Sequence, residues 1–329
     1  MQQNELSLGG MIRSNIWRAT AMAVLLAGAF PVLAIAQQAG QKTFPTAQAA
    51  AKALADAAKN NDQSAMLEVL GPGGKEIISS GDDVEDTQNR ATFAMRYQEM
   101  HRLVKEPNGT TTLYVGSENW PLPIPLVGKA GAWYFDTGRA KMEILYRRVG
   151  RNEMSTIMTA QELVAAQKEY AAAHNGEYAQ KIFSDPGEHN GLYWKADNGQ
   201  PQSPIGPLVA AAVAEGYTDK KEGAAATPYR GYLYGVLTQQ GPHGPGGAKN
   251  YIIDGKMTGG FAFIAYPAAY RSSGVMTFMI CPNGVVYRKD LGPNTEKIAR
   301  SIKSFNPDSS WKKDEDQQQQ QSAMAEKAQ

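Results

Sequence analysis

Residues 154–174 read MSTIMTAQELVAAQKEYAAAH and decide the second half of the fold, because apolar residues recur through them at helical spacing. Asn175-Gly176 follows as a helix stop. The apolar face consists of Ile157, Leu163, Val164, Ala166 and Tyr170. Downstream, period-two patterns predict strands at 231–238, 251–253, 260–266, 275–280 and 285–288. One long helix followed by an antiparallel sheet predicts an α+β domain over residues 151–307.

Turn signals organise the rest of this half. Pro282-Asn283-Gly284 predicts a hairpin, because Asn and Gly tolerate the positive φ that tight turns need. Residues 178–202 are rich in Gly, Pro, Asp and Asn and predict an irregular stretch. Short helices are expected at 204–216 and 294–304. The polar tail at 308–329 lacks the apolar residues that would offset its ordering entropy, so we expect disorder there.

Working outward to the N-terminal side, helical patterns cover 46–60, 62–70 and 82–106, and a further helix is expected at 136–148. Strand-like runs at 110–116, 122–127 and 132–135 lie between them. This predicts a first α+β domain over residues 41–150. Both domains are expected to have helices packed on a small antiparallel sheet.

Prolines at 121, 123 and 125 alternate with Leu122, Ile124 and Leu126. Proline cannot donate to a sheet ladder, so this period places every missing donor on one side. We expect residues 119–127 to form an edge strand that is closed to further pairing. The alternative is a polyproline segment that docks a partner.

Residues 1–36 have the features of an export signal. Arg13 and Arg18 precede an apolar run, Ala34-Ile-Ala36 is a cleavage pattern, and Met11 is a plausible true start. An uncleaved anchor is the alternative. Position 37 is glutamine, so no lipid-bearing cysteine follows the cleavage point. The expected product is periplasmic or secreted, with no stable membrane insertion after cleavage.

Charge and cysteine content exclude some classes of function and some kinds of site. Without residues 1–36, the 33 basic and 32 acidic residues each become 31, because Arg13, Arg18 and Glu5 are removed. This balance gives no electrostatic basis for nucleic-acid binding. Cys281 is the only cysteine, which excludes an internal disulfide and multi-cysteine metal sites. Its neighbours resemble a buried strand, so we expect it to be inert.

The densest polar cluster is the segment DPGEHNG at 185–191. Its Asp185, Glu188 and His189, with Trp194 nearby and His243 from a second loop, are the candidate ligand-binding residues, since carboxylate and imidazole are normal polar and metal ligands. The same composition suits a sharp multiple turn. No H-E-x-x-H, G-x-S-x-G, S-x-x-K or P-loop pattern occurs, and no catalytic residue, metal or cofactor is predicted.

Six segments carry a resemblance to a known family. They are SGDDVEDTQNRATF (80–93), ENWPLPIPLV (118–127), WYFDTG (133–138), EILYRRVGRNE (143–153), FSDPGEHNGLYW (183–194) and GYLYGVLTQQGP (231–242). With them the chain resembles the bacterial exported family known as domain of unknown function 2950. That resemblance implies membership of a family with no established activity, so it implies no mechanism.

The second half also resembles the globular heads of type IV pilins and pseudopilins. The segments are AQKEYAAAHNGEYA (166–179), GYLYGVL (231–237), YPAAYRSSGVMTFMI (266–280) and NGVVYRKD (283–290). Pilins keep their hydrophobic helix next to the head, whereas here it lies more than 110 residues upstream. The sequence therefore predicts a pilin-like head fold without pilus polymerisation.

Together these features favour a soluble exported cell-envelope protein that acts as a non-catalytic binding or assembly factor, with a possible envelope protein as partner. One alternative is an envelope hydrolase or metal-dependent enzyme that uses the Asp185/His189 loop. Another is a secretion- or pilus-associated subunit.

Overall fold

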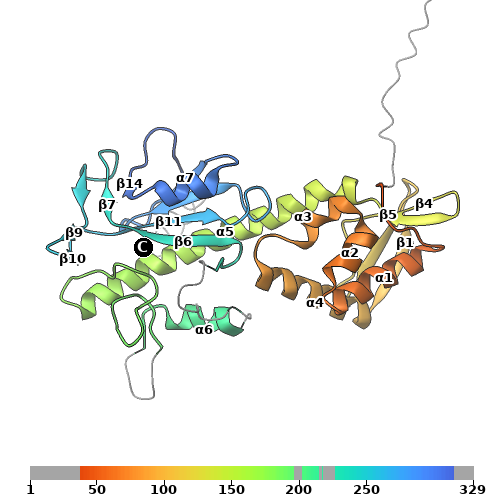
Figure 1. Ribbon diagram of the computed structural model, residues 1–329, viewed down its shortest axis with the longest axis horizontal. Helices are drawn as coiled ribbons and strands as arrows, with labels where there is room; N and C mark the ends of the chain where they lie inside the picture. The colour runs from red at the N-terminus through yellow and green to blue at the C-terminus, as the bar shows by residue number, and fades with distance from the viewer. Residues whose placement is uncertain (1–37, 196–201, 215–216, 218–226, 315–329) are drawn as a thin grey trace, which may run out of the picture. The chain divides into compact units, whose positions relative to one another are not determined.

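The computed structural model describes residues 38–195, 202–214, 217 and 227–314 (Figure 1). The expected signal peptide at 1–36 lies outside these residues. The described chain is α+β, with a helical N-terminal region and several sheets whose strands are mostly antiparallel. This confirms the predicted class. Among the described residues, no helix has the length and apolar character needed to cross a membrane.

The N-terminal helices begin where their capping residues stand. Thr46 caps α1 (Ala47–Lys59), Asp62 caps α2 (Gln63–Leu70) and Asp82 caps α4 (Asp83–Glu99), each side chain accepting a backbone N–H three residues on. Between α2 and α4 lie the 3₁₀ turn η1 (Pro72–Gly74) and the short α3 (Lys75–Ile78).

The predicted helix at 82–106 is wrong beyond Glu99. The chain leaves α4 at Met100, which has extended backbone (φ −162°, ψ 138°), and continues as β1 (His101–Lys105). This strand pairs along its whole length with β2 (Thr111–Val115). A five-residue run does not distinguish a strand from a continuing helix, and only the partner strand decides between them.

The first sheet has the order β1-β2-β4-β5, and β3 also pairs with β2. Its remaining strands are β3 (Trp120–Pro121), β4 (Leu126–Lys129) and β5 (Ala132–Phe135). The proline-rich edge strand predicted at 119–127 is wrong, because the chain leaves the ladder between β3 and β4. Leu122 and Ile124 become buried in the core instead, with 9% and 2% of their surface exposed.

The helices predicted at 136–148 and 154–174 are one helix, α5 (Thr137–Ala173). An interior glycine costs a helix roughly 1 kcal/mol relative to alanine, so Gly150 does not by itself end it. Burial of Leu145, Arg148, Asn152 and Ile157 on both sides of Gly150 holds the backbone helical.

The second sheet has the order β15-β13-β12-β11-β6. Its strands are β6 (Tyr232–Leu237), β11 (Ala262–Pro267), β12 (Met276–Ile280), β13 (Val286–Asp290) and β15 (Lys312–Lys313). The hairpin at 282–284 is confirmed, with Gly284 at φ 77° between β12 and β13. The neighbouring helices are α6 (Gly206–Ala214) and α7 (Thr295–Ser301).

Small pairings complete this half. A three-stranded sheet joins β7 (Gln239–Gln240), β8 (Lys249–Asn250) and β14 (Ser304–Phe305), and a two-stranded ribbon joins β9 (Ile252–Ile253) to β10 (Lys256–Met257). The tail at 308–329, for which we expect disorder, is ordered at its start. Lys312 and Lys313 form β15 because their backbone pairs with β13.

The described residues contain two separate clusters of buried apolar side chains. One gathers residues between Phe44 and Ala140, and the other gathers residues between Ile157 and Phe305. Cys281 belongs to the second cluster and is 2% exposed, as expected for an inert thiol. Burial raises the pKa of this thiol.

Candidate functional site

A cavity of about 430 Å³ opens beside the first apolar cluster. Its volume falls within the range of roughly 300–1,000 Å³ that is common for small-molecule sites. The apolar part of its wall comes from α1, α2, α3, α4, the first sheet and α5. These apolar residues include Leu54, Met66, Leu70, Ile78, Phe93, Val115, Trp120, Leu122, Ile124 and Ile144.

Five arginines and one aspartate also line this cavity. Arg90 and Arg96 come from α4, whereas Arg147, Arg148 and Arg151 come from α5; the aspartate is Asp86. Glu143 pairs with Arg147 at 2.7 Å, and Glu85 pairs with Arg151 at 2.6 Å. Counting these neighbours with Asp86, five positive charges face three negative ones, so the cavity keeps an excess of two positive charges.

Arg96 is the cation in this wall that is available to a ligand. It is half-buried, and among the described residues its guanidinium has no hydrogen-bond or ion-pair partner. A planar guanidinium presents donors in a fork that matches carboxylate and phosphate oxygens. A partly buried location strengthens such contacts because water screens them less.

The two inner arginines are satisfied by neutral acceptors. Arg90 donates to Asn61 Oδ1 at 2.5 Å and to the carbonyl of Ile78 at 2.9 Å. Arg148, which is 6% exposed, donates to the carbonyls of Glu76 (2.8 Å) and Ile77. The fold therefore holds their charges in place, and among the described residues no direct ion pair neutralises them.

Among the described residues that line the cavity, Asp86 supplies the only carboxylate. Its Oδ2 accepts the Ser80 backbone N–H at 2.7 Å, and only 4% of the residue is exposed. Burial raises its pKa above the ordinary value, an effect that the bonds from Ser80 and the charges of Arg148 and Arg90 partly oppose.

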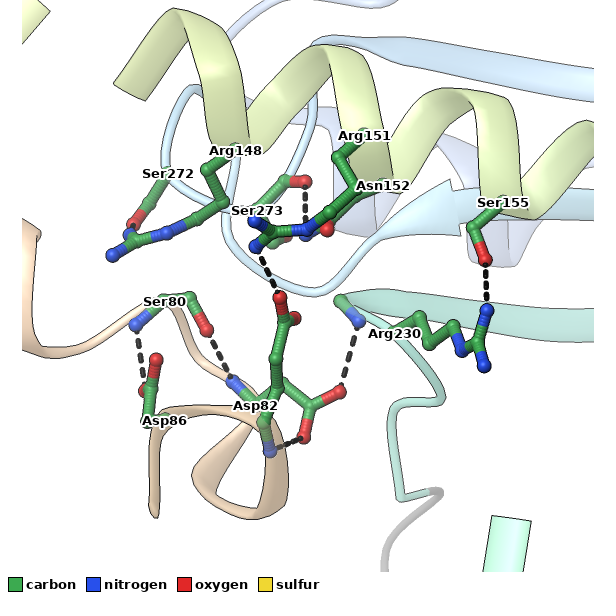
Figure 2. A network of polar contacts seen from close by, with 12 residues as sticks. Ser80, Asp82, Asp86, Arg148, Arg151, Asn152, Ser155, Arg230, Ser272 and Ser273 are labelled. Atoms are coloured by element: carbon green, nitrogen blue, oxygen red, sulfur yellow. Dashed lines mark hydrogen bonds and ion pairs between the residues drawn. The ribbon is translucent and has the colours of Figure 1, made fainter. Parts of the chain in front are cut away.

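A polar network behind this wall joins α4 and α5 to the second half of the chain (Figure 2). Asp82, 1% exposed, caps α4 with Oδ1 and accepts from Tyr217 Oη (2.7 Å) and Gly231 N (2.9 Å) with Oδ2. Burial, followed by the bond to Asp82, raises the pKa of Tyr217, so the phenol remains a donor.

Side chains of α5 extend this network. Asn152 donates to the Ser273 carbonyl at 3.1 Å, and Arg148 also reaches Ser272 Oγ at 3.4 Å (Figure 2). A Cβ on Gly231 would lie 2.6 Å from Asn152 Nδ2, and its φ is +78°, so a side chain does not fit there. The wall of the cavity and the second sheet are thus packed against one another through α5.

The residues singled out from the sequence lie elsewhere. Asp185 accepts from Lys181 Nζ (2.6 Å) and Asn190 Nδ2 (2.9 Å), and these bonds, Lys181 first, lower its pKa. Glu188 is exposed and donates its backbone N–H to the Asp185 carbonyl. His189 stacks on Trp194 with ring centroids 4.5 Å apart. The structure places Asp185, Glu188 and His189 in one turn, and Trp194 contacts this turn through His189.

His243 lies in a different loop, where its Nδ1 and Asn306 Oδ1 are 3.1 Å apart. No contact between described residues joins it to the turn at 185–191. Within the described part of the chain, no three His, Cys, Asp or Glu side chains gather as metal ligands. A ligand-binding role for Asp185, Glu188, His189, Trp194 and His243 stays a prediction.

Sequence reasoning missed the arginines of the cavity. Arg147, Arg148 and Arg151 follow helical spacing within the segment 143–153, and Arg90 and Arg96 follow it within α4. Such a pattern is typical of a solvated helix face, so it carries no signal until the two helices are placed. Three of the six segments on which the family resemblance rests, 80–93, 118–127 and 143–153, meet at this cavity.

The fold and this cavity define an α+β protein with an arginine-lined apolar site. The chain belongs to the family described as protein of unknown function DUF2950, whose model matches residues 41–313. No curated protein and no solved structure matches the chain. The resemblance to pilin heads therefore rests on the sequence segments alone.

Proposed function

We propose that this protein is a non-catalytic binding protein whose ligand is a small amphipathic anion. The observation that carries the proposal is the cavity of about 430 Å³, where an apolar floor meets an excess of positive charge and the guanidinium of Arg96, which has no partner among the described residues. An organic carboxylate, sulfonate or phosphate with an apolar body fits this combination. Its anionic group would bind Arg96, and its body would cover Phe93, Trp120 and Ile144.

The apolar floor distinguishes this ligand from a free inorganic anion. Phe93, Trp120 and Ile144 are only partly buried and pack against the first core. A ligand that covers them gains roughly 25 cal/mol for each Å² of apolar surface removed from water. Charge alone would not use this surface.

Binding of decanoate, decanol and acetate, measured by isothermal titration calorimetry, tests the proposal. We expect decanoate to bind, decanol to bind about tenfold or more weakly because it lacks the charge, and acetate not to bind measurably. Equal affinities for decanoate and decanol would show that the arginines of the cavity do not contribute to binding.

Arg96→Gln is the matching protein variant, with Arg139→Gln as its control. Arg139 is an exposed arginine on α5 that lies outside the cavity and has no side-chain partner among the described residues. Arg96→Gln should weaken decanoate binding about tenfold, whereas Arg139→Gln should leave it unchanged. The same loss in both variants would indicate a general charge effect instead of a site.

The exported location belongs to the same proposal. The features at 1–36 support a cleaved signal and a periplasmic or secreted product that begins at Gln37. The N-terminal sequence and mass of the protein recovered from a periplasmic extract test this. Recovery of a longer chain in the membrane fraction would favour the uncleaved anchor.

The two-domain organisation, with a pilin-like second domain, is also proposed. The two separate apolar clusters support it, since each half of the chain has its own core. Limited proteolysis that released one stable fragment ending near residue 150 would support independent folding. The alternative of a hydrolase at the Asp185/His189 loop gains no support, because the Asp185 carboxylate is occupied by Lys181 and Asn190.

A further inference from the structure

Strand β6 has one backbone edge that no other strand of its sheet covers, because it is the last strand in the order β15-β13-β12-β11-β6. The Gly231 carbonyl accepts the Ala268 N–H at 2.9 Å, which identifies the residues whose backbone faces β11. In an antiparallel ladder these residues alternate. Leu233, Gly235 and Leu237 therefore face β11, and the even-numbered residues face outward.

This outer edge is closed at both ends and open between them. Tyr232 exchanges two backbone hydrogen bonds with Tyr229, at 2.8 and 3.1 Å, and the Thr238 carbonyl accepts from Tyr251 N at 3.0 Å. Between them, the N–H and C=O groups of Tyr234 and Val236 have no partner among the described residues. Two residues of a strand span about 7 Å, so four main-chain groups form one short gap.

A pocket of about 520 Å³ lies directly beside this gap. All four residues from Leu233 to Val236 line it. The wall also includes Leu208, Val209 and Val213 of α6, together with Phe183. Val213 and Phe183 are about half exposed, at 50% and 46%.

We infer that the open edge at Tyr234 and Val236, together with this pocket, binds an extended peptide segment of another polypeptide by adding it as a strand to β6. Alternating donors and acceptors on a strand edge match the backbone of an extended chain. Every second side chain of such a strand points to the same face, so the pocket selects a segment that is apolar at alternate residues.

Charge contributes little to this recognition. Lys181 is the one charged side chain among the described residues that line the pocket, and it pairs with Asp185 at 2.6 Å. The peptide is therefore recognised by its main chain and by its apolar side chains. This site is separate from the arginine-lined cavity, and no described residue lines both.

Fluorescence anisotropy with a labelled peptide acetyl-KVTVTVK-amide tests the inference on the full chain. A matched peptide that is N-methylated at its central valine keeps the side chains but loses one donor and cannot pair fully. We expect saturable binding of the first peptide and about tenfold weaker binding of the second. Hydrogen exchange should show the Tyr234 and Val236 amides slowed when the first peptide is present.

Two protein variants address the edge and the pocket separately. Val236→Pro removes an outward N–H that is not part of the β11 ladder, a position where a sheet tolerates proline. Val213→Glu places a charge in the pocket, and Ile253→Glu, at an apolar residue that is also 50% exposed but outside the pocket, is its control. Both site variants should lose about tenfold in peptide affinity, and the control should not.

Each of the following results would overturn the inference. The first is no saturable binding of acetyl-KVTVTVK-amide up to about 1 mM. The second is equal binding of the two peptides, or unchanged binding by Val213→Glu with its fold intact. The third is protection of the Tyr234 and Val236 amides that rises with protein concentration alone, which would assign the edge to a second copy of this chain.

Discussion

Replacing Asp82 by alanine should reduce stability far more than loss of an ordinary helix cap. Asp82 is buried and its carboxylate accepts three bonds, from Glu85 N at 3.1 Å, Tyr217 Oη at 2.7 Å and Gly231 N at 2.9 Å. An N-cap bond contributes about 1 kcal/mol. A hydrogen bond to a charged group contributes about 1.5–3 kcal/mol.

With about 1 kcal/mol for the cap and about 1.5 kcal/mol for each of the other two bonds, Asp82→Ala lowers the free energy of unfolding by about 4 kcal/mol. Asp62→Ala is the matched control, because Asp62 caps α2 by one bond to Ala65 N at 2.9 Å and is exposed. The control should lose about 1 kcal/mol. Urea unfolding followed by circular dichroism, with both midpoint and slope compared, measures the two losses.

A difference of less than about 1 kcal/mol between the two variants would refute the reasoning, because the two bonds to the second half would then contribute nothing. Tyr217→Phe gives an internal check. It removes the hydroxyl that donates to Asp82 and accepts from Arg230 N at 3.1 Å, and it should lose about 1.5 kcal/mol.

Four further predictions concern buried groups and glycines. Burial raises the pKa of Asp86, so between its ordinary value of 3.8 and the raised value the folded chain keeps a proton that the unfolded chain has lost. The free energy of unfolding should therefore fall as pH rises through that window. Asp86→Asn should flatten this part of the pH dependence in a series of urea unfolding curves. Cys281 should react with 5,5′-dithiobis(2-nitrobenzoate) only after denaturant is added, and rapid reaction of the native protein would contradict its burial. Gly150→Ala should raise the free energy of unfolding by about 0.5–1 kcal/mol, because Gly150 lies in the interior of α5 and an added Cβ would have no atom within 4 Å. Gly231→Ala should lower it by more than 1 kcal/mol in the same assay, roughly the cost of a strained backbone, because its φ is +78° and its Cβ would collide with Asn152.

Local signals predicted the parts of the fold that depend on neighbours in sequence. Thr46 and Asp62 begin helices at the expected positions, and the turn at 282–284 joins two strands as its Asn and Gly require. The same signals failed at residues 101–105 and 119–127, where the outcome depends on β2. A strand partner is invisible to a pattern read along one segment.

The candidate site shows the same division. The polar turn at 185–191 is conspicuous in the sequence because its residues are contiguous, yet Lys181 and Asn190 occupy its carboxylate. The arginines at 90, 96, 147, 148 and 151 are scattered among ordinary charged helix positions. Only the folded arrangement of α4, α5 and the first sheet places them around one cavity.

Composition and spacing within a few residues were enough to predict the α+β class, most of the helices, the hairpin at 282–284 and the burial of Cys281. Tertiary structure alone decided that α5 runs unbroken through Gly150, that β1 is a strand, and that five arginines share one apolar cavity. Those outcomes depend on contacts between residues far apart in the chain, such as Arg148 with Glu76 and Asp82 with Gly231. The energy of such contacts exists only when the whole chain is folded.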